Sequence, residues 1–195
     1  MRRARLEAFS DGVFAIIITI MVLELKVPHG PAFADLVEAL PRFYTYVLSF
    51  IYVGIYWNNH HHLAHTIEHT TGGILWANLF LLFWISLFPF GCAWLDETVF
   101  APWPTVTYAF ILFMAALSYN VLQKTIIHAH GPRSVLARAI GRPWKELISL
   151  TFYAAAMGFA FVATPISQAF LVAVAIIWLV PDRRIERVVV AEAEE

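Results

Sequence analysis

The segment from Leu6 to Val27 has the sequence LEAFSDGVFAIIITIMVLELKV, and its apolar length decides the fold class. A membrane-spanning helix needs about 20 mostly apolar residues, and this segment meets that length although it carries Glu7, Asp11 and Glu24. A secretory signal is not expected, because the run is too long, holds these carboxylates and is followed by no small-x-small cleavage site. We therefore predict a retained transmembrane helix.

The whole chain has the composition of a membrane protein. Of its 195 residues, 60% are hydrophobic and only 14% are charged, whereas soluble domains hold roughly 45–50% apolar and about 25% charged residues. The net charge of −1 shows no excess of basic residues of the kind that binds nucleic acid. The single cysteine, Cys92, excludes an internal disulfide and a cysteine-based zinc site. Lipid must therefore solvate much of the surface, and neither a nucleic-acid partner nor a cofactor is expected.

Five further apolar stretches are long enough to be considered as membrane spans. The six predicted spans are approximately 6–27, 43–63, 74–95, 106–127, 147–163 and 166–180. We predict an all-α membrane protein whose residues 1–195 form a single transmembrane domain. Pro89 is expected to kink the third helix, and Pro165 is expected in the first turn of the last helix, after a tight hairpin. Asn78 and Asn120 lie within predicted spans and are expected to bond to neighbouring helices.

The distribution of Lys and Arg predicts the orientation of these spans. With six spans, one side carries Arg2, Arg3, Arg5, Lys124, Arg133, Arg138, Arg142, Lys145, Arg183, Arg184 and Arg187. Only Lys26 and Arg42 fall on the other side. Because basic residues are enriched in cytoplasmic segments, we predict cytoplasmic termini for a multi-pass protein of the cell membrane. The acidic tail 191–195 is predicted to be disordered.

The first predicted helix has one smooth face. At about 100° per residue, this face collects Arg5, Phe9, Gly12, Ile16, Thr19, Ile20 and Leu23. Asp11 lies about 140° away from Ile16, on nearly the opposite side. A carboxylate within a membrane helix is costly and faces protein or a water-filled cavity. The Asp11 side is therefore expected to be turned into the protein.

Two interpretations of this face remain open from the residues alone. In the first, it packs against another helix, Gly12 permits close approach, and Thr19 bonds to its own backbone. In the second, copies of the helix surround an axis, and Ile16, Ile20 and Leu23 form apolar constrictions of a pore. Channels can gate by dewetting at such rings, while hydroxyl or carbonyl oxygens coordinate the ion.

The second predicted helix is rich in histidine. It contains Trp57-Asn58-Asn59-His60-His61-His62, followed by His65 and His69. His61, His65 and His69 share an i, i+4, i+8 stripe, which suggests a metal, but no carboxylate-rich partner motif follows. We therefore predict no metal site. The histidines are interpreted as packing or interfacial side chains, or else His60 or His61 reaches Asp11 as a buried polar bridge.

Two motifs resemble a known family. Arg5-Leu-Glu-Ala-Phe9-Ser10-Asp11-Gly-Val-Phe-Ala-Ile16 is similar to the Arg-x-x-x-Phe-Ser-Asp signature of the transmembrane-protein-175 family, whose animal members are endosomal and lysosomal potassium channels. Trp57-x-Asn59-His60-His61 resembles the second-helix motif of that family. Six spans in one copy resemble its bacterial members, which assemble as tetramers.

The resemblance implies a homotetrameric, passive, potassium-preferring channel whose pore is lined by the first helix. Ile16 and Leu23 would form bulky apolar layers, with Thr19 or Ile20 between them. A supporting polar network would consist of Arg5, Ser10, Asp11, Trp57, His60 and His61. Because the chain contains no Thr-Val-Gly-Tyr-Gly filter, we expect a hydroxyl ring from Thr19 to select K⁺ only weakly over Na⁺.

Two other classes of function are possible alternatives. A proton- or cation-coupled secondary transporter could use Asp11 and the histidines as a relay, but Asp11 would then have to face a water-filled route. Transporters also commonly show inverted repeats and broken helices, and the first span has no such break. An enzyme is not expected, because the sequence shows no nucleophile–base pair, no phosphate-binding loop and no acidic metal cluster.

Overall fold

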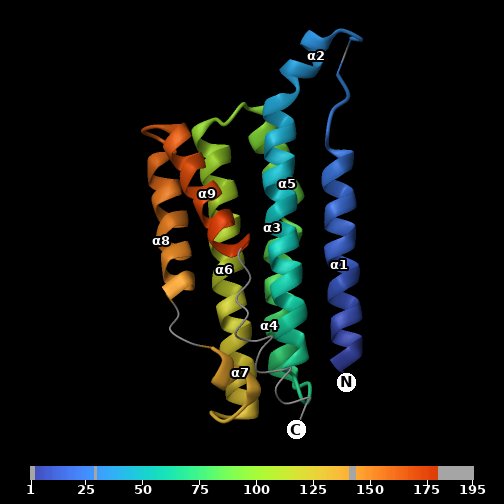
Figure 1. The fold of residues 1–195 in the computed structure, drawn as a ribbon, viewed down its shortest axis with the longest axis vertical. Helices are drawn as coiled ribbons and strands as arrows, with labels where there is room; N and C mark the ends of the chain where they lie inside the picture. Colours follow the sequence, from blue (N-terminus) through green and yellow to red (C-terminus); the bar gives the residue numbers. More distant parts are fainter. Residues whose placement is uncertain (1–2, 29, 141–143, 180–195) are drawn as a thin grey trace.

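The computed structural model describes residues 3–28, 30–140 and 144–179, and all regular structure within them is helical. The longer helices are α1 (Arg3–Leu23), α3 (Leu40–His65), α4 (Gly72–Ser86), α5 (Phe88–Glu97), α6 (Pro102–His130), α8 (Trp144–Phe159) and α9 (Thr164–Leu179). The two short helices are α2 (Phe33–Glu38) and α7 (Val135–Ala139). Figure 1 shows the longer helices side by side along one axis, with α2 at one end and α7 at the other. The predicted acidic tail 191–195 lies outside the described residues.

Several of the described helices are apolar, and three of the described stretches have the length of a membrane span. Within the described ranges, Arg3–Leu23, Gly72–Glu97 and Pro102–His130 are long and apolar enough to cross a membrane. The helices α8 and α9 have 16 residues each, which is about 24 Å of helix against a hydrocarbon core of about 30 Å. The chain is thus an all-α membrane protein with several apolar helices.

The third predicted span is divided into α4 and α5 at Leu87. Pro89 lies in the first turn of α5, where its missing N–H removes no bond within the helix. The Leu87 N–H bonds to the Trp84 carbonyl at 3.3 Å, in a tighter turn. The structure therefore has a short break where a kink was expected. Pro165 takes the same kind of position as the second residue of α9.

The helices α8 and α9 form the predicted tight hairpin. Residues 160–163 connect them. The Ser167 hydroxyl donates to the Ala156 carbonyl at 2.7 Å, and the Trp178 indole Nε1 donates to the Ser149 hydroxyl at 2.8 Å. These two bonds tie the hairpin together near both of its ends.

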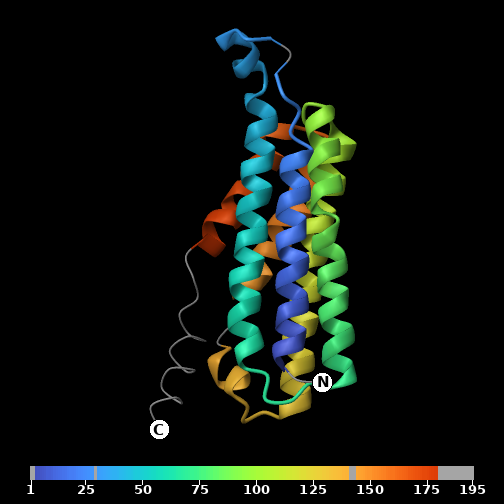
Figure 2. The same ribbon diagram turned by 90° about the vertical axis from the view of Figure 1, so that its right-hand side faces the viewer.

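The helix α1 lies at the edge of the bundle, whereas α6 contacts α4, α5, α8 and α9. Large side chains that are fully buried include Tyr52, Tyr108, Tyr153, Phe14 and Phe88. α1 packs on α3, α4 and α5. Figure 2 shows α1 in the foreground, between α3 and the α4–α5 segment. One long face of α1 is therefore left uncovered by the described part of the chain.

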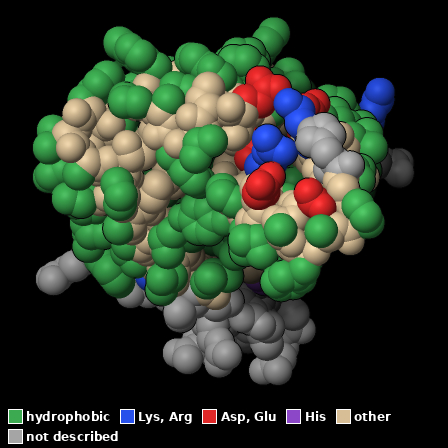
Figure 3. Space-filling view, turned by 90° about the horizontal axis from the view of Figure 1, so that it is seen from above, with side chains coloured by type: hydrophobic (Ala, Val, Ile, Leu, Met, Phe, Trp, Pro, Cys, Tyr) green, Lys and Arg blue, Asp and Glu red, His purple; other side chains and the backbone are tan. Residues whose placement is uncertain are grey.

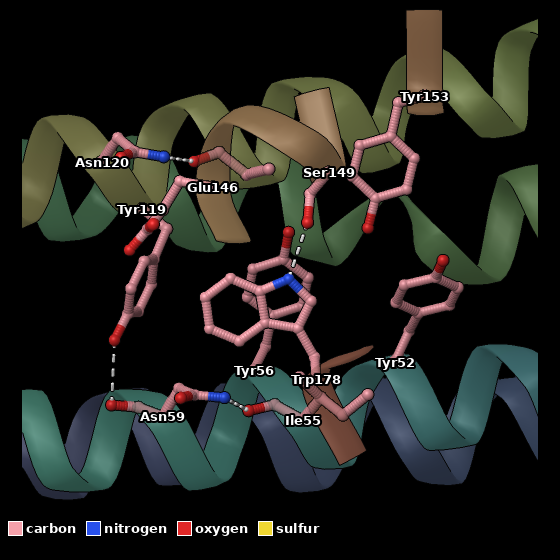
Figure 4. A pocket seen from close by; sticks show the side chains of 11 residues that line it. Tyr52, Ile55, Tyr56, Asn59, Tyr119, Asn120, Glu146, Ser149, Tyr153 and Trp178 are labelled. Carbon is pink, nitrogen blue, oxygen red and sulfur yellow. Dashed lines mark hydrogen bonds between the residues drawn. The ribbon is translucent and has the colours of Figure 1, made fainter. Parts of the chain in front are cut away.

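A small cavity lies between α3, α6, α8 and α9 (Figure 4). Its volume of about 30 Å³ is roughly that of one water molecule and far below the 300–1,000 Å³ typical of small-molecule sites. The Tyr119 hydroxyl donates to the Asn59 carbonyl at 3.1 Å, and the Tyr52 hydroxyl donates to the Leu171 carbonyl at 2.6 Å. The polar groups around this cavity therefore join helices to one another.

The end of the bundle that carries α2 holds two ion pairs. Lys26 Nζ lies 2.8 Å from Glu97 Oε1, and Arg42 Nε lies 3.9 Å from Asp96 Oδ2. They join the segment after α1 and the start of α3 to the end of α5. In Figure 3, which views the molecule from this end, acidic and basic side chains gather in one cluster beside apolar surface. The Lys26 and Glu97 side chains are more than half exposed, so solvent screens their attraction and this pair adds little to stability.

Candidate functional site: the free face of α1 and the contacts that orient it

The helix α1 has one buried face and one exposed face. Its buried residues are Leu6, Ser10, Phe14, Ile17 and Met21. The seven residues of the smooth face are all exposed, namely Arg5, Phe9, Gly12, Ile16, Thr19, Ile20 and Leu23. We call these seven residues the free face of α1. The helical wheel therefore separates the two sides as the structure does.

A buried chain of hydrogen bonds holds the opposite side of α1. The Asn78 amide of α4 donates to the Ser10 hydroxyl at 3.0 Å, and the Ser10 hydroxyl donates to the Leu6 carbonyl at 2.9 Å. His60 Nε2 of α3 lies 2.8 Å from the Asn78 carbonyl oxygen. Because the Asn78 nitrogen faces Ser10, its oxygen accepts, and His60 Nε2 must carry the hydrogen. This Ser10–Asn78–His60 chain links α1, α4 and α3.

The partner of Asp11 is a tryptophan of α3 and not a histidine. The Trp57 indole Nε1 of α3 donates to Asp11 Oδ1 at 3.0 Å. Of the alternatives left open for the histidines, a bridge from His60 or His61 to Asp11 is not formed, since His60 faces α4 and His61 faces Glu7. Trp57 and His61 lie one turn apart on the face of α3 that meets α1. Asp11 is half-buried on this flank and is not enclosed.

A second group of contacts lies near the start of α1. Glu7 Oε1 is 3.3 Å from His61 Nδ1 and 3.6 Å from His65 Nε2. The Arg3 guanidinium donates to the His65 carbonyl at 3.2 Å. Together with the Trp57–Asp11 bond, these contacts hold the flank of α1 on α3 over two turns.

Two other expectations about polar residues need correction, and one stays a prediction. Arg5 lies on the free face, so its place in the polar network stays a prediction, whereas Arg3 contacts the end of α3. His69 leaves the histidine stripe because α3 ends at His65; its ring lies 4.5 Å from the ring of His130. Asn120 donates to the Ala116 carbonyl of its own helix at 2.8 Å. The interhelical bonds expected of Asn78 are confirmed.

Gly12 leaves open space on the free face, and Thr19 places a hydroxyl oxygen on it. A Cβ placed at Gly12 would meet no other atom within 4 Å, so nothing described in the chain requires glycine there, although glycine costs about 1 kcal/mol in a helix relative to alanine. The Thr19 hydroxyl donates to the Ile16 carbonyl at 2.8 Å. Because the donated hydrogen is used within the helix, the oxygen lone pairs remain available on the exposed side.

Replacing Trp57 with phenylalanine tests the flank contact. We expect the variant to be less stable than the parent by about 0.5–1.5 kcal/mol, because one hydrogen bond is lost, with a melting temperature lower by about 1–6 °C. Thermal unfolding of the purified protein in detergent measures the change. Trp76→Phe, at a 75% exposed position on α4, is the matched control; an equal loss in both variants would show that the indole N–H of Trp57 contributes nothing.

Comparisons with known proteins bear on this arrangement. Residues 5–89 match the family model described as "Endosomal/lysosomal potassium channel TMEM175". A potassium channel from Chryseobacterium is 53% identical over 96% of this chain and 97% of its own length. The crystal structure of a lysosomal potassium-selective channel TMEM175 homolog from Chamaesiphon minutus superposes with a TM-score of 0.80 at 28% identity, covering 92% of this chain and 97% of that one.

An animal relative is described as having a different activity. A protein from Rattus norvegicus, described as an endosomal/lysosomal proton channel, is 28% identical over 89% of this chain, which spans 38% of the rat protein. The resemblance in the motifs implied potassium channels among the animal members. The bacterial relatives above are described as potassium channels.

Proposed function

Because this chain belongs to the TMEM175 family and is a potassium channel, not an enzyme, we propose that four copies assemble around a pore lined by α1. The observation that carries this proposal is the free face of α1, which no described part of the chain covers. One helix per chain cannot enclose a conduit, so several copies must contribute to it. K⁺ would then cross passively, without a coupled ion.

The contacts of α1 support this placement of the free face. The Ser10–Asn78–His60 chain fixes the buried side, and the Trp57–Asp11 bond fixes one flank. With two sides of the helix bound, rotation of α1 is restricted. The open space at Gly12 permits close approach by another copy.

The free face carries the residue types that a narrow cation pore needs. Ile16, Ile20 and Leu23 are 59%, 41% and 82% exposed, and in a tetramer each would form a ring of four apolar side chains. Such rings exclude water and gate conduction. Thr19, between the first two rings, would offer four hydroxyl oxygens to a partly dehydrated K⁺. A hydroxyl ring of this kind predicts weak discrimination against Na⁺.

We propose that one end of the bundle faces the cytoplasm, namely the end that holds α7 and the start of α1. Arg3 contacts the end of α3, and Lys124, Arg133 and Arg138 follow in or after α6 towards the same end. Cytoplasmic segments are enriched in such residues. Together with the bacterial relative described as a potassium channel, this orientation supports a location in the cell membrane.

Flux from liposomes tests conduction itself. Protein reconstituted with an outward K⁺ gradient, and with no ATP and equal pH on both sides, is expected to pass K⁺ at a rate above that of empty vesicles. The coupled-transporter alternative requires Asp11 on a water-filled route, whereas Asp11 lies off the free face and accepts a bond from Trp57. A fixed ratio of protons moved to K⁺ moved would favour the transporter and contradict the channel.

Replacing Thr19 with valine tests the proposed selectivity ring. The change removes the hydroxyl but keeps the branched shape, so K⁺ current should persist while the K⁺/Na⁺ permeability ratio falls by about threefold or more, which corresponds to about 0.6 kcal/mol. Reversal potentials in planar bilayers give the ratio. Thr151→Val is the control, because Thr151 is also exposed and bonds to its own helix, but on α8. An unchanged ratio in Thr19→Val would contradict the role of the hydroxyl.

A further inference from the structure

Glu7, His61 and His65 bring one ligand atom each to a common point between α1 and α3. These three atoms all lie within 4.8 Å of one another. Two of the side chains come from α3, one turn apart, and the third comes from α1, more than 50 positions earlier in the sequence. These contacts help to hold α1 on α3, and they also bring two histidines to one carboxylate, a ligand set that metal sites use.

The distances fit a small transition-metal ion. Zn²⁺ binds histidine nitrogen and carboxylate oxygen at about 2.0–2.2 Å in a tetrahedral arrangement, which places its ligand atoms about 3.4 Å apart. Glu7 Oε1 is 3.3 Å from His61 Nδ1 and 3.6 Å from His65 Nε2. The three ligands could therefore close on an ion with small side-chain movements.

The site is accessible and has a suitable charge. The side chains of His61 and His65 are 42% and 37% exposed, and that of Glu7 is 19% exposed, so an ion can enter from solvent and keep a water as its fourth ligand. The Glu7 carboxylate supplies a negative charge, and Asp11 supplies a second one turn along α1. Arg3, which donates to the His65 carbonyl, is the opposing positive charge.

We propose that Glu7, His61 and His65 form a binding site for a divalent transition-metal ion of the Zn²⁺ class. The ion would tie the first turns of α1 to the last turn of α3. Two imidazoles and one carboxylate favour Zn²⁺ over Mg²⁺, which prefers oxygen ligands and retains its water. The test of this site is independent of the proposed pore, because it measures metal binding and not ion flux.

Titration of the purified full-length protein with Zn²⁺ after treatment with a chelator tests the site. Calorimetry should give one ion per chain, and the melting temperature should rise by about 5–10 °C at a hundredfold excess over the dissociation constant. Glu7→Gln and His65→Ala should each weaken binding by about tenfold or more, since even partners outside the ligand set affect metal affinity by 10–100-fold. Mg²⁺ at the same concentration should leave both readouts unchanged.

Control variants separate this site from other histidines. His128→Ala removes an exposed histidine of α6 and should bind Zn²⁺ as the parent does. His69→Ala breaks the His69–His130 ring pair and should also leave the affinity unchanged. Undiminished binding in both Glu7→Gln and His65→Ala would overturn the proposal, as would loss of binding in His69→Ala alone. The melting temperature without metal checks that each variant is folded.

Discussion

Ile16→Asn is expected to raise the K⁺ flux of reconstituted protein about tenfold or more. In the proposed tetramer this change places four amides in a ring that four isoleucine side chains would otherwise keep dry. An apolar constriction opposes conduction because a hydrated ion cannot keep its water there. Lowering this barrier by about 1.4 kcal/mol already increases the rate tenfold. We expect four amides to lower it by at least that amount, because they keep water in the ring.

The matched control for this prediction is Ile176→Asn. Ile176 lies on α9, and its side chain is 59% exposed, as is that of Ile16. Both substitutions therefore introduce the same polar group at an equally exposed isoleucine of an apolar helix. Flux through Ile176→Asn should remain close to that of the parent. Equal flux in all three proteins, or an equal increase in both variants, would contradict a pore on the free face of α1.

The orientation of α1 could be predicted from sequence because it depends on local periodicity. A helix turns by about 100° per residue, so the positions of Ile16 and Asp11 relative to one another follow from their spacing alone. Burial of Ser10 and Phe14, and exposure of Ile16, agree with this wheel. The wheel could not distinguish a pore from lipid or from helix packing, because each of these environments accepts an apolar stripe.

The partners of the polar residues could not be predicted in the same way. Asp11 bonds to Trp57, and Glu7 faces His61; both pairings depend on how α1 and α3 are placed side by side. Spacing within one segment contains no such information. The histidine stripe suggested a metal but offered no carboxylate, and the structure supplies one, Glu7, from a different helix.

The histidine pattern did not by itself indicate where α3 ends. The i, i+4, i+8 pattern would extend to His69 if the helix continued, but α3 ends at His65, before the paired glycines that begin α4. The break at Leu87 is more predictable, because Pro89 cannot continue a helix that needs its N–H. The predicted second span ended at residue 63, two residues before the end of α3, and at Pro89 a kink was predicted where the structure has a break.

Asn78→Ala is expected to destabilise the protein by about 2–3 kcal/mol. An interhelical hydrogen bond within a membrane contributes about 0.6 kcal/mol on average, but a buried group that loses its partner costs about 1–3 kcal/mol. The second effect is larger here, because the change removes the partner of His60 Nε2 and the donor to Ser10 at once. Both side chains are buried, at 2% and 0% exposure, so water cannot readily replace the lost amide.

Thermal unfolding in detergent should show this loss as a melting temperature lower by about 5–10 °C. Asn120→Ala removes the same amide from α6, where it bonds only to the Ala116 carbonyl of its own helix among the described residues, and should lower the melting temperature by less than half as much. The loosened α1 should then be freer to rotate, so the K⁺/Na⁺ permeability ratio of Asn78→Ala should fall towards one. Equal stability of the two variants would mean that the Ser10–Asn78–His60 chain does not hold α1 in place, and the free face would need another cause for its direction.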